Sequence, residues 1–273
     1  MPELTSNGIN LHYTDSGGDG RPVVLIHGWP LSGASWSEQE GALTAAGYRV
    51  ITYDRRGFGE SEKPADGYDY DTLAADLAGL IEGLDLEDVT LVGFSMGGGE
   101  VARYVGTYGD EGLNSVVFAG AVPPYLLKSD DNPEGGLGEE DVQEFEEGVR
   151  SDRAGFLDGF TTDFFSVDGE LKVTEEQRQQ ALAMEAPAAD QALLGCIDAF
   201  GRTDFRQDVA RVQVPALVIH GDSDSIVPFE VSGKRTAEAI PNSTVVVIEG
   251  APHGFNTSHS EQFNNELLAF LDR

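Results

Sequence analysis

A serine, a histidine and an aspartate occur in this chain in settings that suit acyl transfer. Ser95 is the centre of a G-F-S-M-G segment (residues 93–97), directly after the apolar run 89–92 and before a helix-like stretch, 98–108. Where a strand turns sharply into a helix, a Cβ on either flank would collide with the neighbouring backbone, so glycine is needed there. The pattern predicts a nucleophilic serine that projects from the edge of a sheet.

His253 is the expected general base. It lies in the loop 249–254, which follows the last strand-like run, 244–248. An imidazole can take the serine proton during attack and return it to the leaving group, which accelerates such reactions roughly 10²–10⁴-fold. His259 is the neighbouring alternative, but it falls in the predicted start of the last helix, and we interpret it as a surface residue.

A carboxylate is needed to orient the imidazole, and the segment 220–228 offers two. We choose Asp224, which lies further from the strand end in the pattern H-G-x-x-D-x-x-x-P; Asp222 is the alternative. A calcium loop does not fit, because Ile226 occupies the third ligand position of that motif. The order Ser…Asp…His along the chain is the one that a G-x-S-x-G serine requires.

Two backbone N–H groups are expected to receive the oxyanion of the reaction. One is that of Met96, the residue after the serine, and the other belongs to the loop 27–30, after the strand-like run 23–26. Within this loop Trp29 is the candidate, because Pro30 has no N–H. Pro30 should also restrict the direction of the Trp29 carbonyl.

We expect a small apolar pocket beside the serine, below aromatic side chains of a helical lid. Packing in the core is the alternative explanation for the same side chains. The candidates are Trp29, Pro30, Phe160, Phe164, Ile226 and Phe229.

Alternating apolar runs and helical periodicities predict a mostly parallel sheet covered on both faces. Residues 8–14 are expected to end a leading hairpin. The other predicted strands are 23–26, 49–53, 89–92, 115–118, 216–219 and 244–248, and the clearest helices outside the lid are 73–84, 98–108 and one after a capping box of Ser258 and Glu261.

Strands are absent from the pattern between residue 123 and residue 216. We therefore predict a core domain of residues 1–122 and 209–273 with a helical cap inserted at 123–208. Apolar periodicities predict three helices in the cap, around 142–149, 156–164 and 193–200, and Thr174 with Gln177 forms a capping box.

The composition of the chain excludes several classes of partner. Its 273 residues include 48 acidic and 17 basic side chains, a formal net charge of −31. Such a charge repels phosphates, which excludes nucleic acid and anionic membranes. The acidic residues are dispersed, which favours adaptation to molar salt over a docking patch for a cationic partner. Because the Debye length falls to about 3 Å in 1 M salt, we expect folding to depend on salt.

Cysteine and histidine usage gives no sign of a metal or another cofactor. Cys196 is the only cysteine, and its helical spacing with apolar residues predicts a buried thiol. The five histidines fall in separate segments without a ligand motif. The segment 1–5 has neither a basic nor an apolar region, and no run of residues reaches membrane-spanning length, so we expect a soluble, cytoplasmic protein.

Five segments that span nearly the whole chain share their patterns with one known family. They are H-G-W-P (27–30), Y-D-R-R-G-F-G (53–59), G-F-S-M-G-G-G-E (93–100), A-V-P-P (121–124) and G-A-P-H-G (250–254). Together they resemble the cofactor-free haloperoxidase and aryl esterase branch of the α/β-hydrolases. The resemblance implies an α/β-hydrolase fold, and it assigns a structural role to the Asp54-Arg55 pair.

The resemblance also implies an activity. An ester or a small carboxylic acid would acylate Ser95, and hydrogen peroxide would then replace water, releasing a peracid that oxidises halide. Members with a tryptophan-proline pair in the oxyanion loop are described as perhydrolases, which Trp29 and Pro30 match. The resemblance also suggests a homo-oligomer. Haloalkane dehalogenases and epoxide hydrolases use aspartate as nucleophile, so Ser95 argues against both.

Two other functions stay open from the sequence. A lactone hydrolase or a carbon–carbon bond hydrolase could use the same triad. A receptor of this fold that binds a small molecule without turnover has no need for Ser95, Asp224 and His253 together.

Overall fold

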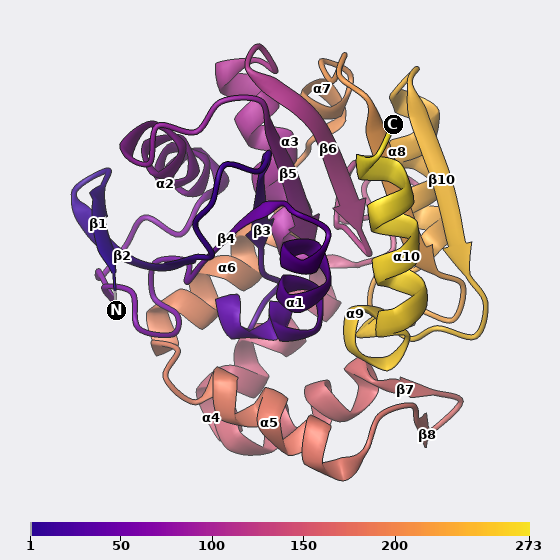
Figure 1. The fold of residues 1–273 in the computed structure, drawn as a ribbon. Coiled ribbons are helices and arrows are strands. Elements are labelled where there is room, and N and C mark those ends of the chain that lie inside the picture. The colour runs from indigo at the N-terminus through magenta and orange to yellow at the C-terminus, as the bar shows by residue number, and fades with distance from the viewer. Residues whose placement is uncertain (1) are drawn as a thin grey trace.

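The chain forms a central eight-stranded sheet with helices on both faces (Figure 1). The computed structural model describes residues 2–273. The strands of the large sheet are β1 (Glu3–Ser6), β2 (Ile9–Asp15), β3 (Pro22–Ile26), β4 (Arg49–Tyr53), β5 (Val89–Phe94), β6 (Leu113–Ala119), β9 (Ala216–Gly221) and β10 (Ser243–Ile248). All the strands expected from the sequence are present, and β5 runs two residues further than predicted.

The helices alternate with these strands through most of the chain. They are η1 (Gly33–Trp36), α1 (Ser37–Ala45), α2 (Tyr70–Gly83), α3 (Met96–Tyr108), α4 (Glu139–Phe164), α5 (Glu175–Glu185), α6 (Asp190–Arg202), α7 (Arg206–Val209), η2 (Phe229–Val231), α8 (Gly233–Ala239), α9 (Phe255–Ser258) and α10 (Ser260–Leu271). A small hairpin of β7 (Ser166–Val167) and β8 (Glu170–Leu171) follows α4, so the expectation of no strands between residues 123 and 216 is wrong at this point.

The strand order in the large sheet is β1-β2-β4-β3-β5-β6-β9-β10. From β4 to β10 all neighbours are parallel, whereas β1 and β2 pair antiparallel and form the expected leading hairpin. Strands β3, β5 and β9 are buried along their whole length, as their continuous apolar runs require of central parallel strands.

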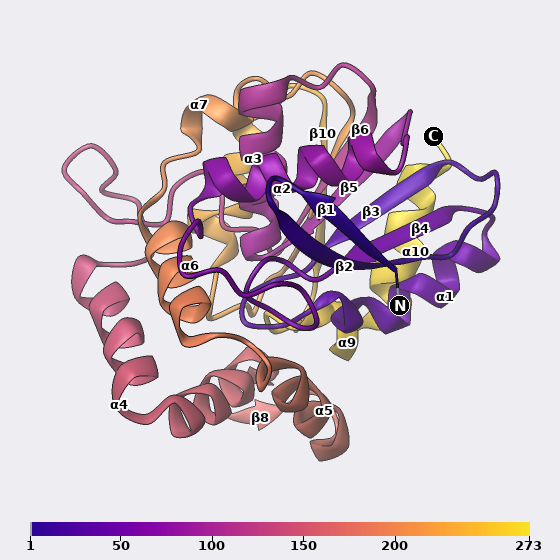
Figure 2. The same ribbon diagram turned by 90° about the vertical axis from the view of Figure 1, so that its left-hand side faces the viewer.

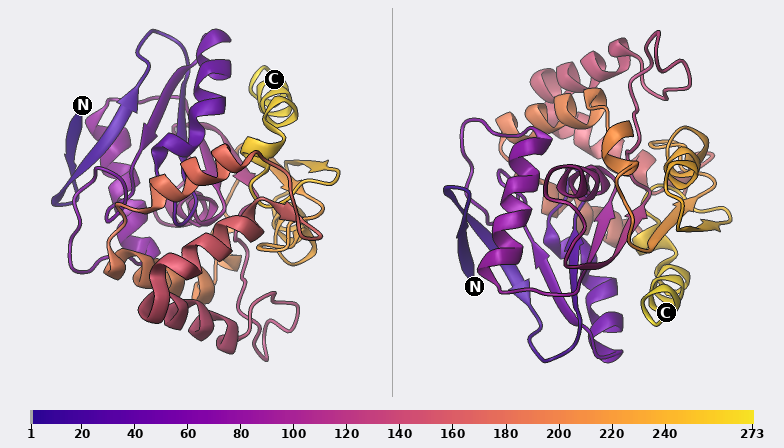
Figure 3. Two further views of the ribbon diagram at one scale, coloured as in Figure 1. Left: turned by 90° about the horizontal axis from the view of Figure 1, so that it is seen from below. Right: turned by 90° about the horizontal axis from the view of Figure 1, so that it is seen from above.

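Two helical layers cover the sheet (Figure 3). Helix α1 packs against α10, while α2, α3, α7 and α8 contact one another in that order in a second layer. The predicted inward side chains of α10, Phe263, Leu267, Phe270 and Leu271, are all buried.

The segment between β6 and β9 lies at the carboxyl edge of the parallel strands (Figure 2). The two helices predicted around residues 142–149 and 156–164 form one long element, α4, which is broken at Asp152 (φ −149°, ψ 74°). The capping box of Thr174 and Gln177 is confirmed at the start of α5. Cys196 in α6 is buried as expected, and burial raises the pKa of its thiol to about 12.

One predicted helix start is wrong. Ser258 is the last residue of the short helix α9, and His259 is the N-cap of α10, without a capping hydrogen bond from its side chain. The pattern S-x-x-E is therefore present in the sequence but does not form the box. Within residues 2–273 no helix combines the length and the apolar character needed to cross a bilayer.

Candidate functional site

Ser95 lies on a sharp turn between β5 and α3. Its backbone has φ 52° and ψ −119°, a conformation that an L-residue adopts only under strain. The flanking glycines allow the turn: a Cβ on Gly93 would lie 2.4 Å from the carbonyl oxygen of Gly97, and a Cβ on Gly97 would lie 2.4 Å from that of Ile26. The steric reason predicted for the two glycines is thus present in the fold.

His253 and Asp224 complete a chain of hydrogen bonds that starts at Ser95. The Oγ atom of Ser95 is 2.9 Å from Nε2 of His253, and Nδ1 of His253 is 2.6 Å from Oδ2 of Asp224. These side chains come from the carboxyl ends of β5, β10 and β9, which meet at one edge because the strands are parallel. All three residues are buried.

The surroundings of Asp224 keep its carboxyl group ionised. Burial by itself would raise its pKa, but the charge of His253 and hydrogen bonds from His220 and His253 outweigh burial and lower the pKa to about 2. Oδ1 accepts two further hydrogen bonds, from the backbone N–H groups of Ile226 (3.0 Å) and Val227 (2.8 Å). An ionised carboxylate at this place can stabilise a positive charge on His253.

The other candidate acid, Asp222, points elsewhere. It is exposed, and its Oδ1 accepts hydrogen bonds from the backbone N–H of Gly250 (2.7 Å) and from Ser223 Oγ (2.9 Å). Asp222 therefore holds the loop after β10 and does not contact His253. His259 is half-buried, and its ring is hydrogen-bonded to the neighbouring Ser258 (2.9 Å) and not to Ser95.

The predicted oxyanion loop lies directly beside the serine. A Cβ on Gly28 would come within 3.1 Å of the Ser95 Cβ, so only glycine lets the loop approach this closely. Within residues 2–273 the N–H of Trp29 has no hydrogen-bond partner. Met96 is the first residue of α3, where N–H groups lack partners inside the helix. Both predicted donors are free to serve a ligand.

A buried ion pair, which the sequence did not reveal, connects this loop to α3. The Arg55 guanidinium lies 2.5 Å from Glu100 in α3 and donates to the His27 carbonyl (2.6 Å), while the hydroxyl of Tyr53 also donates to Glu100 (2.7 Å). Burial and the charge of Arg55 hold the pKa of His27 well below its ordinary value. The network joins the two chain segments that carry the predicted oxyanion donors.

A narrow apolar cavity of about 30 Å³ opens onto Ser95. Its lining is Trp29, Ser95, Val122, Leu126, Leu137, Phe145, Phe160, Phe200, Ile226 and Val227. Three of the predicted pocket residues belong to this lining, namely Trp29, Phe160 and Ile226. A space of this size holds on the order of two water molecules, so it suits only a small group without rearrangement of the lining.

The other three pocket candidates lie outside this lining. Pro30 is buried in the oxyanion loop. Phe164 packs edge-on against the His253 ring at 5.0 Å and thus shields the imidazole. Phe229 packs against the ring of His220 at 5.6 Å, because the chain turns away from Ser95 after Val227. The six lining residues that the sequence did not reveal lie far apart in the chain, in the loop after β6, in α4 and the loop before it, in α6 and in the loop after β9.

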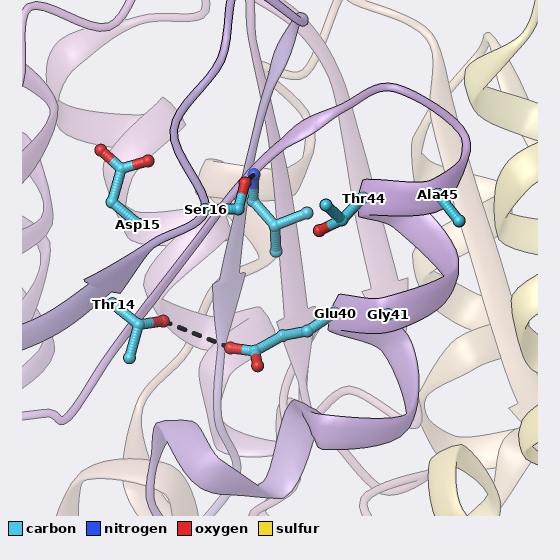
Figure 4. A pocket seen from close by; sticks show the side chains of 8 residues that line it. Thr14, Asp15, Ser16, Glu40, Gly41, Thr44 and Ala45 are labelled. Atoms are coloured by element: carbon cyan, nitrogen blue, oxygen red, sulfur yellow. Dashed lines mark hydrogen bonds between the residues drawn. The ribbon is translucent and has the colours of Figure 1, made fainter.

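A larger hollow of about 580 Å³ lies away from Ser95, between β2 and α1 (Figure 4). Both of its carboxylates are engaged: Asp15 pairs with Arg49 at 2.7 Å, and Glu40 accepts a hydrogen bond from Thr14 at 3.2 Å. No histidine or cysteine lines it. Within residues 2–273 no cluster of three or more acidic, histidine or cysteine residues could hold a metal ion.

Comparison with known proteins identifies the family. A model of the alpha/beta hydrolase fold matches residues 21–259. The non-heme chloroperoxidase of Kitasatospora aureofaciens is 44% identical over an alignment that covers 100% of both chains. The chain belongs to the non-heme haloperoxidase family of α/β-hydrolases. It is therefore an enzyme of this fold.

Two further relatives of this haloperoxidase-family hydrolase bear on its chemistry. The bifunctional esterase/perhydrolase of Acinetobacter calcoaceticus is 36% identical, with 98% of each chain covered. The crystal structure of a bromoperoxidase from Bacillus anthracis is 54% identical and superposes with a TM-score of 0.96 over 100% of both chains. The family that the sequence motifs resemble is thus confirmed.

Proposed function

We propose that this haloperoxidase-family hydrolase is a serine carboxylesterase that cleaves small or aryl esters and also forms peracids. The observation that carries the proposal is the chain of short hydrogen bonds from Ser95 through His253 to Asp224. The esterase/perhydrolase of Acinetobacter calcoaceticus supports the choice of substrates. Hydrogen peroxide is the second substrate of the peracid reaction, and halide is oxidised afterwards by the free peracid.

The first half of the reaction forms an acyl-enzyme. Ser95 Oγ attacks the ester carbonyl carbon while Nε2 of His253 takes the hydroxyl proton. The N–H groups of Trp29 and Met96 hydrogen-bond to the carbonyl oxygen as it becomes negative, and such donors are worth about 10²–10³ in kcat each. When the tetrahedral intermediate collapses, the ester C–O bond breaks and His253 returns the proton to the leaving alcohol.

The second half releases the acid or the peracid. Water or hydrogen peroxide gives a proton to His253 and attacks the acyl carbon, and the bond to Ser95 Oγ breaks as that oxygen regains the proton. Water gives a carboxylic acid, and hydrogen peroxide gives a peracid. The ionised Asp224 holds the imidazolium that exists transiently in both halves.

The segment 123–208 is proposed to act as the lid of this site. Helix α4 ends beside His253, where the Phe164 carbonyl accepts a hydrogen bond from the N–H of Gly254 (2.8 Å). Phe160 and Phe200, from α4 and α6, close the apolar cavity over Ser95. A lid in this position limits the access of water to the acyl-enzyme, so that hydrogen peroxide can compete with water for attack on the acyl carbon. A homo-oligomer and a cytoplasmic location belong to the same proposal.

The test compares wild type with Ser95→Ala in molar potassium chloride. Both proteins are incubated with p-nitrophenyl acetate, with and without hydrogen peroxide, while nitrophenol and peracetic acid are followed together. Loss of the nucleophile should lower nitrophenol release about 10⁴-fold or more. The variant also measures the direct reaction of peroxide with the ester, which is subtracted.

The outcomes separate the possible functions. Release that depends on Ser95 and yields peracid supports the proposal in full. Release that depends on Ser95 but gives no peracid leaves an esterase and removes the perhydrolase part. Release that survives in Ser95→Ala contradicts the mechanism, and absence of turnover with any ester favours a receptor or a hydrolase of another bond.

A further inference from the structure

A second histidine contacts the carboxylate oxygen that His253 binds. Nε2 of His220, in β9, lies 3.3 Å from Oδ2 of Asp224 and 2.7 Å from the carbonyl oxygen of Val227. Both histidines are buried. Asp224 therefore faces four N–H groups: two from the backbone on Oδ1 and two from imidazoles on Oδ2.

The neighbours of His220 fix where its ring carries a proton. A backbone carbonyl and an ionised carboxylate can only accept hydrogen bonds, so Nε2, which faces both, must be protonated. Nδ1 is buried and has no hydrogen-bond partner within residues 2–273. The ring is also held in place sterically, because a Cβ on Gly233 would lie 2.6 Å from Nδ1 and Phe229 packs against the ring.

We propose that His220 is a positioning residue that donates from Nε2 to Asp224 and thereby sets the pH at which His253 becomes an active base. This inference rests on the proposed function. A donor on Oδ2 draws negative charge away from the carboxylate, so His253 experiences less of it. Without this donor the carboxylate holds a proton on His253 more strongly.

Few other groups can contribute to this titration. Ser95 and Asp224 are the polar side chains hydrogen-bonded to His253, while the lid and β5 face the imidazole with the apolar rings of Phe164 and Phe94. Around Asp224 the charged partners that lower its pKa are His253 and His220. A change at His220 should therefore reach His253 through Asp224.

The test is the pH profile of kcat/KM for p-nitrophenyl acetate, which has an acid limb from the free enzyme's base. In His220→Phe the acid limb should shift to higher pH by about half to one unit. At a given pH on this limb, kcat/KM relative to the plateau should therefore fall about three- to tenfold compared with wild type. In His220→Gln an amide N–H can replace Nε2, and the limb should stay at the wild-type position. His259→Gln is the matched control, because it removes a histidine not joined to Ser95 and should leave the limb unchanged.

The outcomes are distinct from a failure of the proposed function. If turnover depends on Ser95 but the limb is identical in wild type, His220→Phe and His220→Gln, the inference is overturned, even if the variants are less stable. If turnover does not depend on Ser95, the esterase mechanism itself fails. Should His220→Phe not fold, nitrogen NMR of the wild-type protein with labelled histidine decides: protonation of His220 at Nε2 is expected, and protonation at Nδ1 alone would overturn the inference.

Discussion

Thr161 donates its hydroxyl to the carboxyl group of Glu185 at 2.6 Å and so joins α4 to α5 inside the helical segment 123–208. Glu185 is buried, and its second oxygen, Oε2, has no partner within residues 2–273. Burial raises the pKa of this carboxyl to about 8, although the Thr161 hydrogen bond and the charge of Arg153 act in the opposite direction. The group is thus protonated at neutral pH.

This carboxyl should make stability depend on pH. Its pKa is about 8 when folded and near 4.5 when the chain is unfolded, so only the unfolded state loses this proton between these values. The contribution of Glu185 to the free energy of unfolding is therefore full below pH 4.5 and is lost as the pH rises to about 8. Glu185→Gln should remove this slope, which amounts to as much as about 1.4 kcal/mol per pH unit.

Urea unfolding in 1 M potassium chloride at several pH values measures the effect as the difference between wild type and variant. Glu176→Gln is the matched control, since it removes an exposed carboxylate from the same helix. A difference between wild type and Glu185→Gln that stays constant from pH 5 to pH 8 would show that the buried carboxyl does not titrate in this window.

Asp224 and Asp222 offer a direct test of the triad. Asp224→Asn should lower kcat for p-nitrophenyl acetate about 10⁴-fold, because an amide cannot stabilise the imidazolium and favours the wrong tautomer of His253. Asp222→Asn keeps an oxygen that can accept from the N–H of Gly250, and kcat should stay near wild type. Comparable losses in the two variants would contradict the assignment.

Short sequence patterns were sufficient to predict those parts of the site that depend on a few neighbouring residues. The glycines around Ser95 and the positions of Asp224 and His253 after strands are properties of short segments. Since parallel strands bring their carboxyl ends together, predicting the sheet also predicted that these loops meet.

Non-local contacts could not be predicted in this way. Arg55 and Glu100 are 45 residues apart and become partners only when the loop after β4 comes to lie against α3. The direction of some side chains could not be predicted for the same reason: Phe229, at the start of η2, follows Ile226 closely in sequence, but it packs against His220. At Ser258 the capping pattern was misleading, since the chain arrives there as the end of α9.

Gly97 should be sensitive to a single methyl group. A Cβ on this residue would lie 2.4 Å from the carbonyl oxygen of Ile26. Because that oxygen belongs to the backbone of a central strand and cannot easily move away, Gly97→Ala should lower the free energy of unfolding by about 3 kcal/mol. Gly159→Ala, on the exposed face of α4 with open space around it, should instead stabilise the protein by about 0.5–1 kcal/mol. Urea unfolding of the two variants measures both effects, and equal effects would exclude the steric explanation.

The net charge of −31 should make the folded state depend on salt. Basic side chains are few enough to be shared: Arg202 pairs with Glu139, Glu146 and Asp198. With 48 acidic and 17 basic side chains in the sequence, the carboxylates far outnumber the groups that could pair with them. Their mutual repulsion is screened as the Debye length falls from about 10 Å in 0.1 M salt to about 3 Å in 1 M.

The melting temperature should therefore rise steeply with potassium chloride up to about 1 M and more slowly above it, because screening is then nearly complete. Exclusion of salt from the protein surface would instead stabilise steadily with concentration. Thermal unfolding from 0.1 M to 3 M potassium chloride distinguishes the two mechanisms, with sucrose as an uncharged control that should lack the steep initial rise. A melting temperature that does not change below 1 M would mean that the repulsion between the carboxylates contributes little to stability.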